Sequence, residues 1–203
     1  MIIGYEDTSV EKIIKANKIA KGTFYHYFKS KEDLLDALVL EMSDMIMDKL
    51  YECVDNIFFS AVEKLNKIFV LSRNIKAENM DLLLPLIRIL YKSNNVLMRY
   101  KMFDSNMKLV VPLLVKTIMQ GNSEGVFNVE YIEETANLIM VIGNSFSEKI
   151  AELLLADIAK EKKILKIERE LKAYEQAISR MLGAENGIIS IVDKNIVSIF
   201  VKE

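Results

Sequence analysis

The side chains best suited to bind a charged partner lie close together near the start of the chain. Between residues 9 and 31 the sequence has six lysines and one acid, Glu11, which gives this stretch a charge of +5. The whole chain carries −2, so the remaining residues together carry −7. A small basic segment on an acidic chain is typical of proteins that bind DNA phosphates. A solvated pair of lysine-rich helices would show the same charges, so charge alone leaves both interpretations open.

Residues for other kinds of chemistry are scarce. The 203 residues include one His, His26, and one Cys, Cys53. A zinc site needs several such ligands, a nucleophile activated by histidine could use only His26, and no disulfide can form within the chain. We therefore predict no catalytic residues, no metal and no cofactor. The low cysteine content, the lack of a secretory signal and the lack of an apolar run of about 20 residues predict a cytoplasmic protein without membrane contact.

Short helices are predicted to position the basic stretch. Thr8-Ser9-Val10-Glu11 has the pattern of a capping box, with Thr8 as the cap, and predicts a first helix that ends near Asn17. A second helix is predicted from Ala20 to Phe28. Ser30-Lys31-Glu32-Asp33 resembles a second capping box that opens a long helix. Two short helices joined by a tight turn form a helix-turn-helix unit.

Three neighbouring stretches, Thr8–Ile13, Ile19–Phe28 and Lys29–Leu34, resemble the DNA-binding signature of the tetracycline-repressor (TetR) family of bacterial transcription regulators. The segment Gln120–Phe127 is similar to the turn before the dimerisation helices of many members. The resemblance implies an all-α fold. It places an N-terminal helix-turn-helix DNA-binding domain at residues 1–43 and a helical ligand-binding and dimerisation domain at residues 44–203.

The resemblance also assigns the residues that contact DNA. Gly22 would let the recognition helix approach the major groove, and Thr23 would reach a base edge. Tyr25 and Lys31 would bind phosphates. The full implied set is Thr8, Ser9, Lys21, Gly22, Thr23, Tyr25, His26 and Lys31. Tyr27 and Phe28 are expected in the core.

Family members have a further helix before the stretch that matches residues 3–7. That helix is missing here, so the first domain is expected to be N-terminally incomplete. If the protein begins at Met1, we expect its DNA binding to be weak or absent.

The rest of the chain is predicted to be helical almost throughout. Periodic apolar residues predict helices at 31–54, 60–75, 80–92, 94–120, 129–157 and 160–182, with a kink or restart at Pro112. Met, aromatic and cationic side chains gather between residues 88 and 107, and such a mixture suits an adaptable pocket for an apolar ligand. The residues assigned to effector binding are Arg88, Tyr91, Met98, Tyr100, Met102, Phe103 and Met107. An ordinary helical core would also contain such residues.

Two apolar stripes at helical spacing predict a dimer interface. Such seams pack against each other in helix bundles, and the resemblance implies that two helices from each of two subunits do so here. The assigned residues are Ile132, Ala136, Ile139, Gly143, Phe146 and Ile150 on one helix and Ile167, Leu171, Tyr174 and Ile178 on the next. Packing of the two helices within one chain is the alternative. In the tail, residues 188–192 and 196–201 suggest a hairpin, or an extra helix, that packs on the body.

These expectations together describe a homodimeric, ligand-responsive transcription regulator. The resemblance implies a repressor that a small, largely apolar effector releases from double-stranded operator DNA. A protein-interaction adaptor that has lost DNA binding is the first alternative. A small helical enzyme that uses carboxylates, such as Glu133 and Glu134, is the second.

Overall fold

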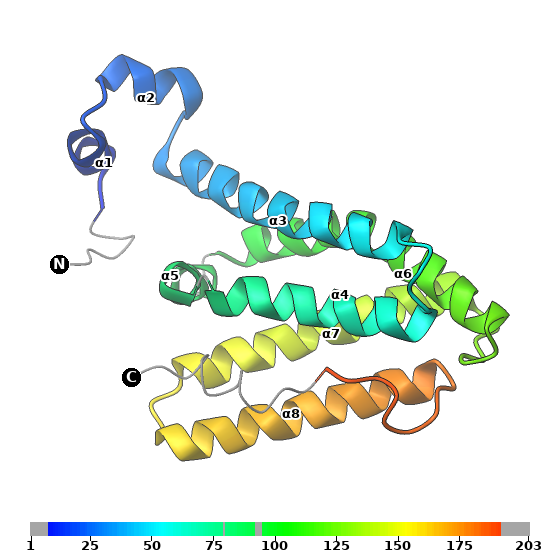
Figure 1. Ribbon diagram of the computed structural model, residues 1–203. Helices are drawn as coiled ribbons and strands as arrows, with labels where there is room; N and C mark the ends of the chain where they lie inside the picture. The colour runs from blue at the N-terminus through cyan, green and yellow to red at the C-terminus, as the bar shows by residue number, and fades with distance from the viewer. Residues whose placement is uncertain (1–7, 79, 92–94, 192–203) are drawn as a thin grey trace. The chain divides into compact units, whose positions relative to one another are not determined.

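The computed structural model describes residues 8–78, 80–91 and 95–191. All regular elements within these residues are helices. They are α1 (Val10–Asn17), α2 (Lys21–Tyr27), α3 (Lys31–Asp55), α4 (Ala61–Glu78), α5 (Met80–Leu90), α6 (Val96–Ser123), α7 (Ile132–Leu155) and α8 (Lys160–Met181) (Figure 1). The predicted all-α fold is confirmed, and each predicted helix lies within a few residues of an observed one. In the part of the chain so described, none of the helices combines the length and the apolar character needed to cross a membrane.

The chain divides into two compact units, residues 1–48 and residues 49–203. Helix α3 begins in the first unit and ends in the second. The functional division after residue 43 remains a prediction.

In the first unit, helix α1 begins one residue later than its predicted cap. Ser9, and not Thr8, is the N-cap, because the Ser9 Oγ accepts a hydrogen bond from the Lys12 amide at 3.3 Å. Lys18 ends α1 in the left-handed conformation, with φ of 53°. The Ile19 amide then donates to the Ile14 carbonyl at 3.2 Å. These bonds form the tight turn that leads into α2.

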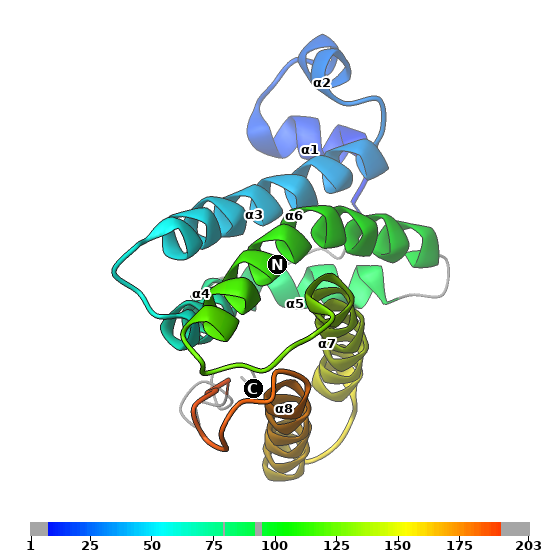
Figure 2. The same ribbon diagram turned by 90° about the vertical axis from the view of Figure 1, so that its right-hand side faces the viewer.

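In the second unit, α7 and α8 run antiparallel beside each other (Figures 1 and 2). Tyr174 of α8 stacks on Phe146 of α7 with ring centroids 4.7 Å apart, and its hydroxyl donates to the Ile139 carbonyl at 3.4 Å. A side chain at Gly143 would obstruct this contact, since a Cβ there would lie 2.7 Å from the Tyr174 hydroxyl. The aromatic pair therefore holds the two helices together within one chain.

This packing bears on the predicted dimer interface. Five of the assigned residues are buried inside the single chain, namely Ala136, Ile139, Ile167, Tyr174 and Ile178. Only residues 156–159 separate α7 from α8, so the two apolar stripes already cover each other within one chain. The part of these five residues in a dimer stays a prediction. The other five, Ile132, Gly143, Phe146, Ile150 and Leu171, are partly buried, and their part in a dimer stays a prediction.

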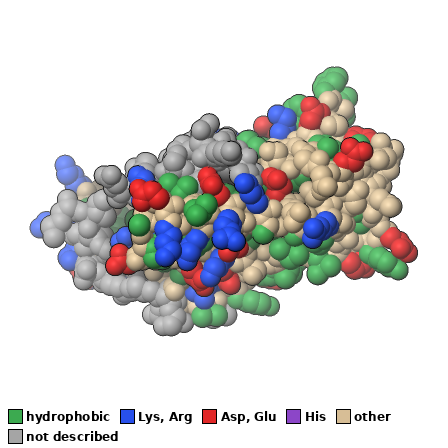
Figure 3. All heavy atoms as spheres, turned by 90° about the horizontal axis from the view of Figure 1, so that it is seen from below, with side chains coloured by type: hydrophobic (Ala, Val, Ile, Leu, Met, Phe, Trp, Pro, Cys, Tyr) green, Lys and Arg blue, Asp and Glu red, His purple; other side chains and the backbone are tan. Residues whose placement is uncertain are grey.

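The outward side of α8 is charged. Lys162, Lys166, Arg169 and Lys172 are exposed there. Figure 3 shows lysine and arginine side chains gathered among acidic ones on this side of the unit. Several large apolar side chains of α7 and α8 are exposed to solvent, namely Leu138, Val141, Leu155 and Leu165.

Helix α6 continues through Pro112 and does not restart there, so that part of the prediction is wrong. Its end depends on two glycines. Gly125 has φ of 71°, which a residue with a side chain rarely adopts, and Gly121 leaves space for a ring: a Cβ there would lie 1.9 Å from Cδ2 of Phe127. The amides of Val126 and Phe127 both donate to the Gly121 carbonyl, at 3.0 and 3.1 Å. This turn delivers the chain to α7.

A polar cluster joins the start of α4 to the end of α6. Lys64 is buried, with 5% of its surface exposed, and its Nζ donates to Gln120 Oε1 at 2.8 Å. The Gln120 Nε2 donates to the Phe59 carbonyl at 3.0 Å and to Glu124 Oε1 at 2.6 Å. Glu124 Oε2 in turn accepts from the Ala61 amide at 2.9 Å. The buried ammonium group thus has a partner, which burial of a charge requires.

Part of the tail packs on the second unit as expected. Ile189 and Ile191 are buried, and Asn66 holds the segment by donating to the Ile188 carbonyl at 2.9 Å and accepting from the Ser190 amide at 2.8 Å. Residues 188–191 do not form a strand. The rest of the predicted hairpin, residues 192–201, lies outside the described residues.

Candidate nucleic-acid interface

Helix α2 has one buried face and one exposed face. Phe24 is its anchor, with 2% of its surface exposed, and its ring centroid lies 5.7 Å from that of Phe28. Tyr27 was expected in the core, but it is 69% exposed, so that prediction is wrong. The spacing of Ala20, Phe24 and Phe28 is the helical signal that could have identified Phe24 as the buried residue. Phe28 itself is partly buried.

The exposed face carries the residues that the resemblance assigns to the recognition helix. These are Lys21, Gly22, Thr23, Tyr25 and His26, all exposed. The Lys21 Nζ lies 5.9 Å from the centre of the Tyr25 ring, so the two side chains are neighbours one turn apart. Hydroxyl, imidazole and ammonium groups therefore share one surface with a tyrosine ring.

The fold of the chain does not require a glycine at position 22. A Cβ at Gly22 would meet no atom of the described residues within 4 Å, and the φ of Gly22 is not positive. In contrast, Gly121 and Gly125 are needed for packing and for backbone conformation. A glycine with no internal purpose on an exposed helical face suits close approach by a partner.

Two helix starts flank α2 in sequence. Ser9 caps α1, and Ser30 Oγ accepts from the Asp33 amide at 3.2 Å at the start of α3. The Lys29 amide donates to Asp33 Oδ2 at 2.8 Å, so Asp33 also closes this start. Lys31 is the first residue of α3. Helix starts attract anions because their first amides point outward, and a lysine adds to that attraction.

The basic residues of this stretch face the solvent. Lys12, Lys15, Lys18, Lys21 and Lys29 are exposed, and Lys31 is partly exposed. The first unit therefore offers positive charge around α2 without burying it. The assigned DNA-binding set stays a prediction at the level of single residues. Thr8 and Lys31 are partly buried, and the other assigned residues are exposed.

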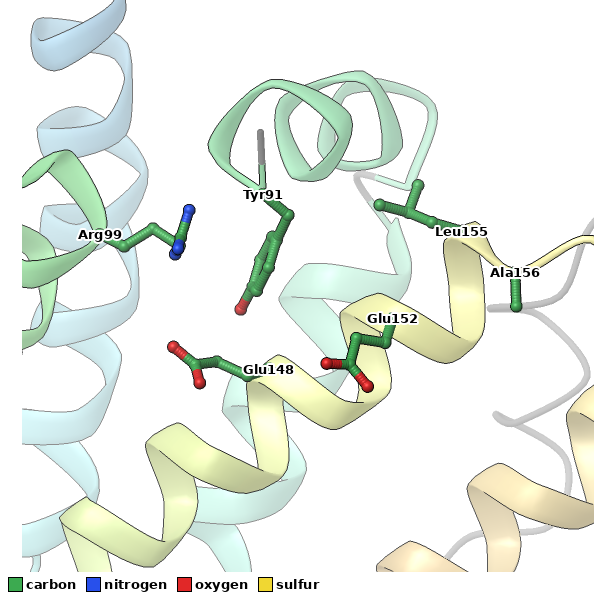
Figure 4. Close-up of a pocket in the computed structure, with 6 residues that line it drawn as sticks. All are labelled: Tyr91, Arg99, Glu148, Glu152, Leu155 and Ala156. Carbon is green, nitrogen blue, oxygen red and sulfur yellow. The ribbon is translucent and has the colours of Figure 1, made fainter. Parts of the chain in front are cut away.

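The residues assigned to effector binding are dispersed. A hollow of about 460 Å³ in the second unit is lined by Tyr91, Arg99, Glu148, Glu152, Leu155 and Ala156 (Figure 4). Tyr91 is the member of the predicted set that lines it. Arg88 and Tyr100 are exposed, Met102, Phe103 and Met107 are partly buried along α6, and the side chain of Met98 lies outside the described part. Glu148 and Glu152 were not predicted to line a pocket, because their spacing on α7 fits an ordinary solvated face.

Two family models match the chain. The model for bacterial regulatory proteins of the tetR family matches residues 3–38, and the model for the tetracyclin repressor-like C-terminal domain matches residues 87–173. The two matches fall in the first and second units, in the order in which the resemblance implies the two domains.

Curated relatives match mainly through a short segment. The uncharacterized HTH-type transcriptional regulator YuxN of Bacillus subtilis is 48% identical over 54 residues, which is 27% of this chain and 17% of that protein. The fatty acid metabolism regulator protein of the same organism is 41% identical over 49 residues, covering 24% of this chain and 25% of that protein. UidR of Escherichia coli, an HTH-type transcriptional regulator, is 34% identical over 56 residues, which cover 28% of this chain and 29% of that protein. The chain thus matches less than a third of the length of each relative.

A solved structure extends the likeness to the whole fold. The crystal structure of a bacterial regulatory protein in the tetR family from Rhodococcus RHA1 aligns with a TM-score of 0.53 and 19% identity, over 90% of both chains. Because two models of one family match in order and the fold agrees along nearly the whole chain, this chain belongs to the tetR family of bacterial regulatory proteins.

Proposed function

We propose that the protein is a transcription regulator that reads double-stranded DNA with helix α2. The observation that carries the proposal is the exposed face of α2, where Gly22, Thr23 and His26 are open to solvent while Phe24 is buried on the opposite side of the helix. Membership of the family supports the same function.

In this proposal the side chains divide into two groups. Thr23 and His26 contact base edges in the major groove, which distinguishes base pairs by their donors and acceptors. Tyr25, Lys31 and the start of α1 at Ser9 contact phosphates, which fix position but carry no sequence information. Lys21 adds a further positive charge beside Tyr25.

The proposed assembly is a homodimer that acts as a cytoplasmic repressor. Two recognition helices held at a fixed distance read two half-sites, and an effector that favours another distance releases the operator. The exposed Leu138 and Val141 on α7 and Leu165 on α8 support an interface on these helices, because monomers seldom leave large apolar side chains in water as a group. The name of one relative, a fatty acid metabolism regulator, supports a small-molecule effector.

The test is fluorescence anisotropy of the full chain with the DNA fragment upstream of its own gene, across a series of salt concentrations. Lys31→Ala is expected to weaken binding to every sequence and to reduce the slope of log affinity against log salt by about 1, because one phosphate contact is lost. Thr23→Ala is expected to change the preference between sequences instead.

The matched control is Lys101→Ala, which removes an exposed lysine of α6 in the second unit. Its salt slope should equal that of the unmodified chain. The proposal fails if the chain binds the upstream fragment no better than an unrelated fragment, or if Lys31→Ala and Lys101→Ala have the same effect.

A further inference from the structure

The segment that follows α8 is held by the second unit in the way that proteins hold an extended peptide. After α8 the chain turns and runs back along that helix (Figure 1). Asn66 of α4 donates from Nδ2 to the Ile188 carbonyl at 2.9 Å and accepts at Oδ1 from the Ser190 amide at 2.8 Å. Glu175 of α8 accepts from the Ile191 amide at 2.8 Å. Side chains of two helices thus bind the backbone that a neighbouring strand would bind in a sheet.

The side chains of this segment alternate between buried and exposed positions. Ile189 and Ile191 are buried, with 1% and 5% of their surface exposed, while Ser190 between them is exposed. Successive side chains of an extended chain point to opposite faces, which explains the alternation. Backbone hydrogen bonds, combined with apolar positions for alternate side chains, are a common means of peptide recognition. We call Asn66, Glu175 and the two buried isoleucine positions the segment site.

The sequence contains the bound pattern twice. The first segment, residues 188–191, reads Ile-Ile-Ser-Ile, and the second segment, residues 196–199, reads Ile-Val-Ser-Ile. The second segment lies eight residues after the first and outside the described residues. Three of its four residues are identical, and Val197 stands where the first segment has Ile189. Isoleucine and valine differ by one methylene group, so the second segment has the chemistry that the segment site binds.

The linker between α8 and the first segment poses little obstacle to a shift of eight residues. Residues 185–187 are exposed, and a Cβ at Gly187 would meet no atom of the described residues within 4 Å. A hollow of about 390 Å³ lies beside this linker and is also lined by Lys172 and Gln176 of α8. The shift lengthens the loop, and the entropy cost of closing a loop grows only with the logarithm of its length.

We propose that the segment site is a peptide-binding site with two ligands in the same chain, and that the second segment exchanges with the first. In the exchanged state Val197 and Ile199 take the two buried positions, and the Ser198 amide donates to Asn66. The first segment then becomes part of a longer loop. The site lies in the second unit, and the proposal does not depend on DNA binding by α2.

The test is hydrogen exchange of the full chain, followed by mass spectrometry of fragments that each contain one segment. In the unmodified chain the first segment should exchange slowly, because the Ser190 and Ile191 amides are hydrogen-bonded, and the second should exchange quickly. Ile189→Asp places a charge in a buried position and should reverse this order, with a change of roughly tenfold or more in each segment. Addition of Val197→Asp to that variant should leave both segments fast.

Two further variants separate exchange of the segments from general damage. Ile57→Asp makes the same substitution at an isoleucine of the second unit that is 85% exposed, and it should leave both segments unchanged. Asn66→Ala removes the backbone contact that either segment uses, so in the Ile189→Asp background it should keep the second segment fast. Circular dichroism verifies that each variant is folded. If Ile189→Asp does not fold, Ile189→Ala replaces it, because it weakens the first segment without burying a charge.

Three results would overturn the inference: a second segment that stays fast in the Ile189 variant, slow exchange there that survives Val197→Asp, or the same reversal in Ile57→Asp. Slow exchange of the second segment that depends on protein concentration would overturn it as well. In that case the segment in the site would come from another copy of the chain.

Discussion

Replacement of Gly22 by alanine should separate the stability of the protein from its affinity for DNA. Gly22 is the second residue of α2, and in the part of the chain that the structure describes the added Cβ would meet no atom within 4 Å. Alanine favours a helix over glycine by roughly 0.5–1 kcal/mol. The free energy of unfolding is therefore expected to stay the same or to rise by up to about 1 kcal/mol.

DNA binding should change in the opposite direction. If the exposed face of α2 docks in the major groove, the new methyl group lies between the helix and the duplex and prevents their closest approach. The loss should resemble that of one base contact, about 1–3 kcal/mol, which corresponds to roughly 5- to 150-fold in affinity.

Two assays measure the free energy of unfolding and the affinity for DNA. Urea unfolding followed by circular dichroism measures stability, and fluorescence anisotropy with the upstream DNA fragment measures affinity. Unchanged affinity in Gly22→Ala would show that this face of α2 does not dock on DNA. A loss of stability would show that position 22 is not open in the folded chain, and the argument from the glycine would then be wrong.

Three further predictions concern the second unit. Gly121→Ala should lower the free energy of unfolding in urea by about 3 kcal/mol or more, because the buried Phe127 ring occupies the place of the new Cβ, and a loss no larger than that of Gly22→Ala would contradict this. Burial raises the pKa of Tyr174 to about 12 from its ordinary value of 10.0. The neutral Tyr174 hydroxyl therefore stabilises the folded chain fully below pH 10, and this stabilisation is lost as the pH rises through 12. The melting temperature of Tyr174→Phe should fall less over that range than that of the unmodified chain. Burial also raises the pKa of the Cys53 thiol, so a thiol reagent should label the native chain much more slowly than the chain in urea, and equal rates would exclude a buried thiol.

The helices and the basic charge around α2 could be predicted because their signals are local. A serine cap involves only a hydroxyl and an amide three residues later, and the charge around α2 is set by residues within 23 positions of one another. The capping error of one residue shows the limit of such signals, since Thr8 and Ser9 are both good caps and only the backbone decides between them.

The direction in which each apolar stripe faces was harder to predict. The same spacing on α7 and α8 serves an interface within the chain or between chains, and the stacking of Phe146 on Tyr174 within the chain follows only from the arrangement of the two helices. The hollow beside Tyr91 is lined by residues of α6, of α7 and of the turn after α5, and the contact of Lys64 with Gln120 joins residues far apart in sequence. No local pattern carries either arrangement.

The small amount of buried surface in α1 and α2 has a thermodynamic consequence. Helix α1, all of whose residues are described, has no fully buried side chain, and α2 has Phe24 alone. Segments with so little buried apolar surface open at low free-energy cost. Docking on DNA would then also fix these helices in one conformation, and that loss of entropy offsets part of the contact energy. A negative heat-capacity change on binding would in that case come in part from ordering of the protein itself, and dissociation would be faster than the number of contacts suggests.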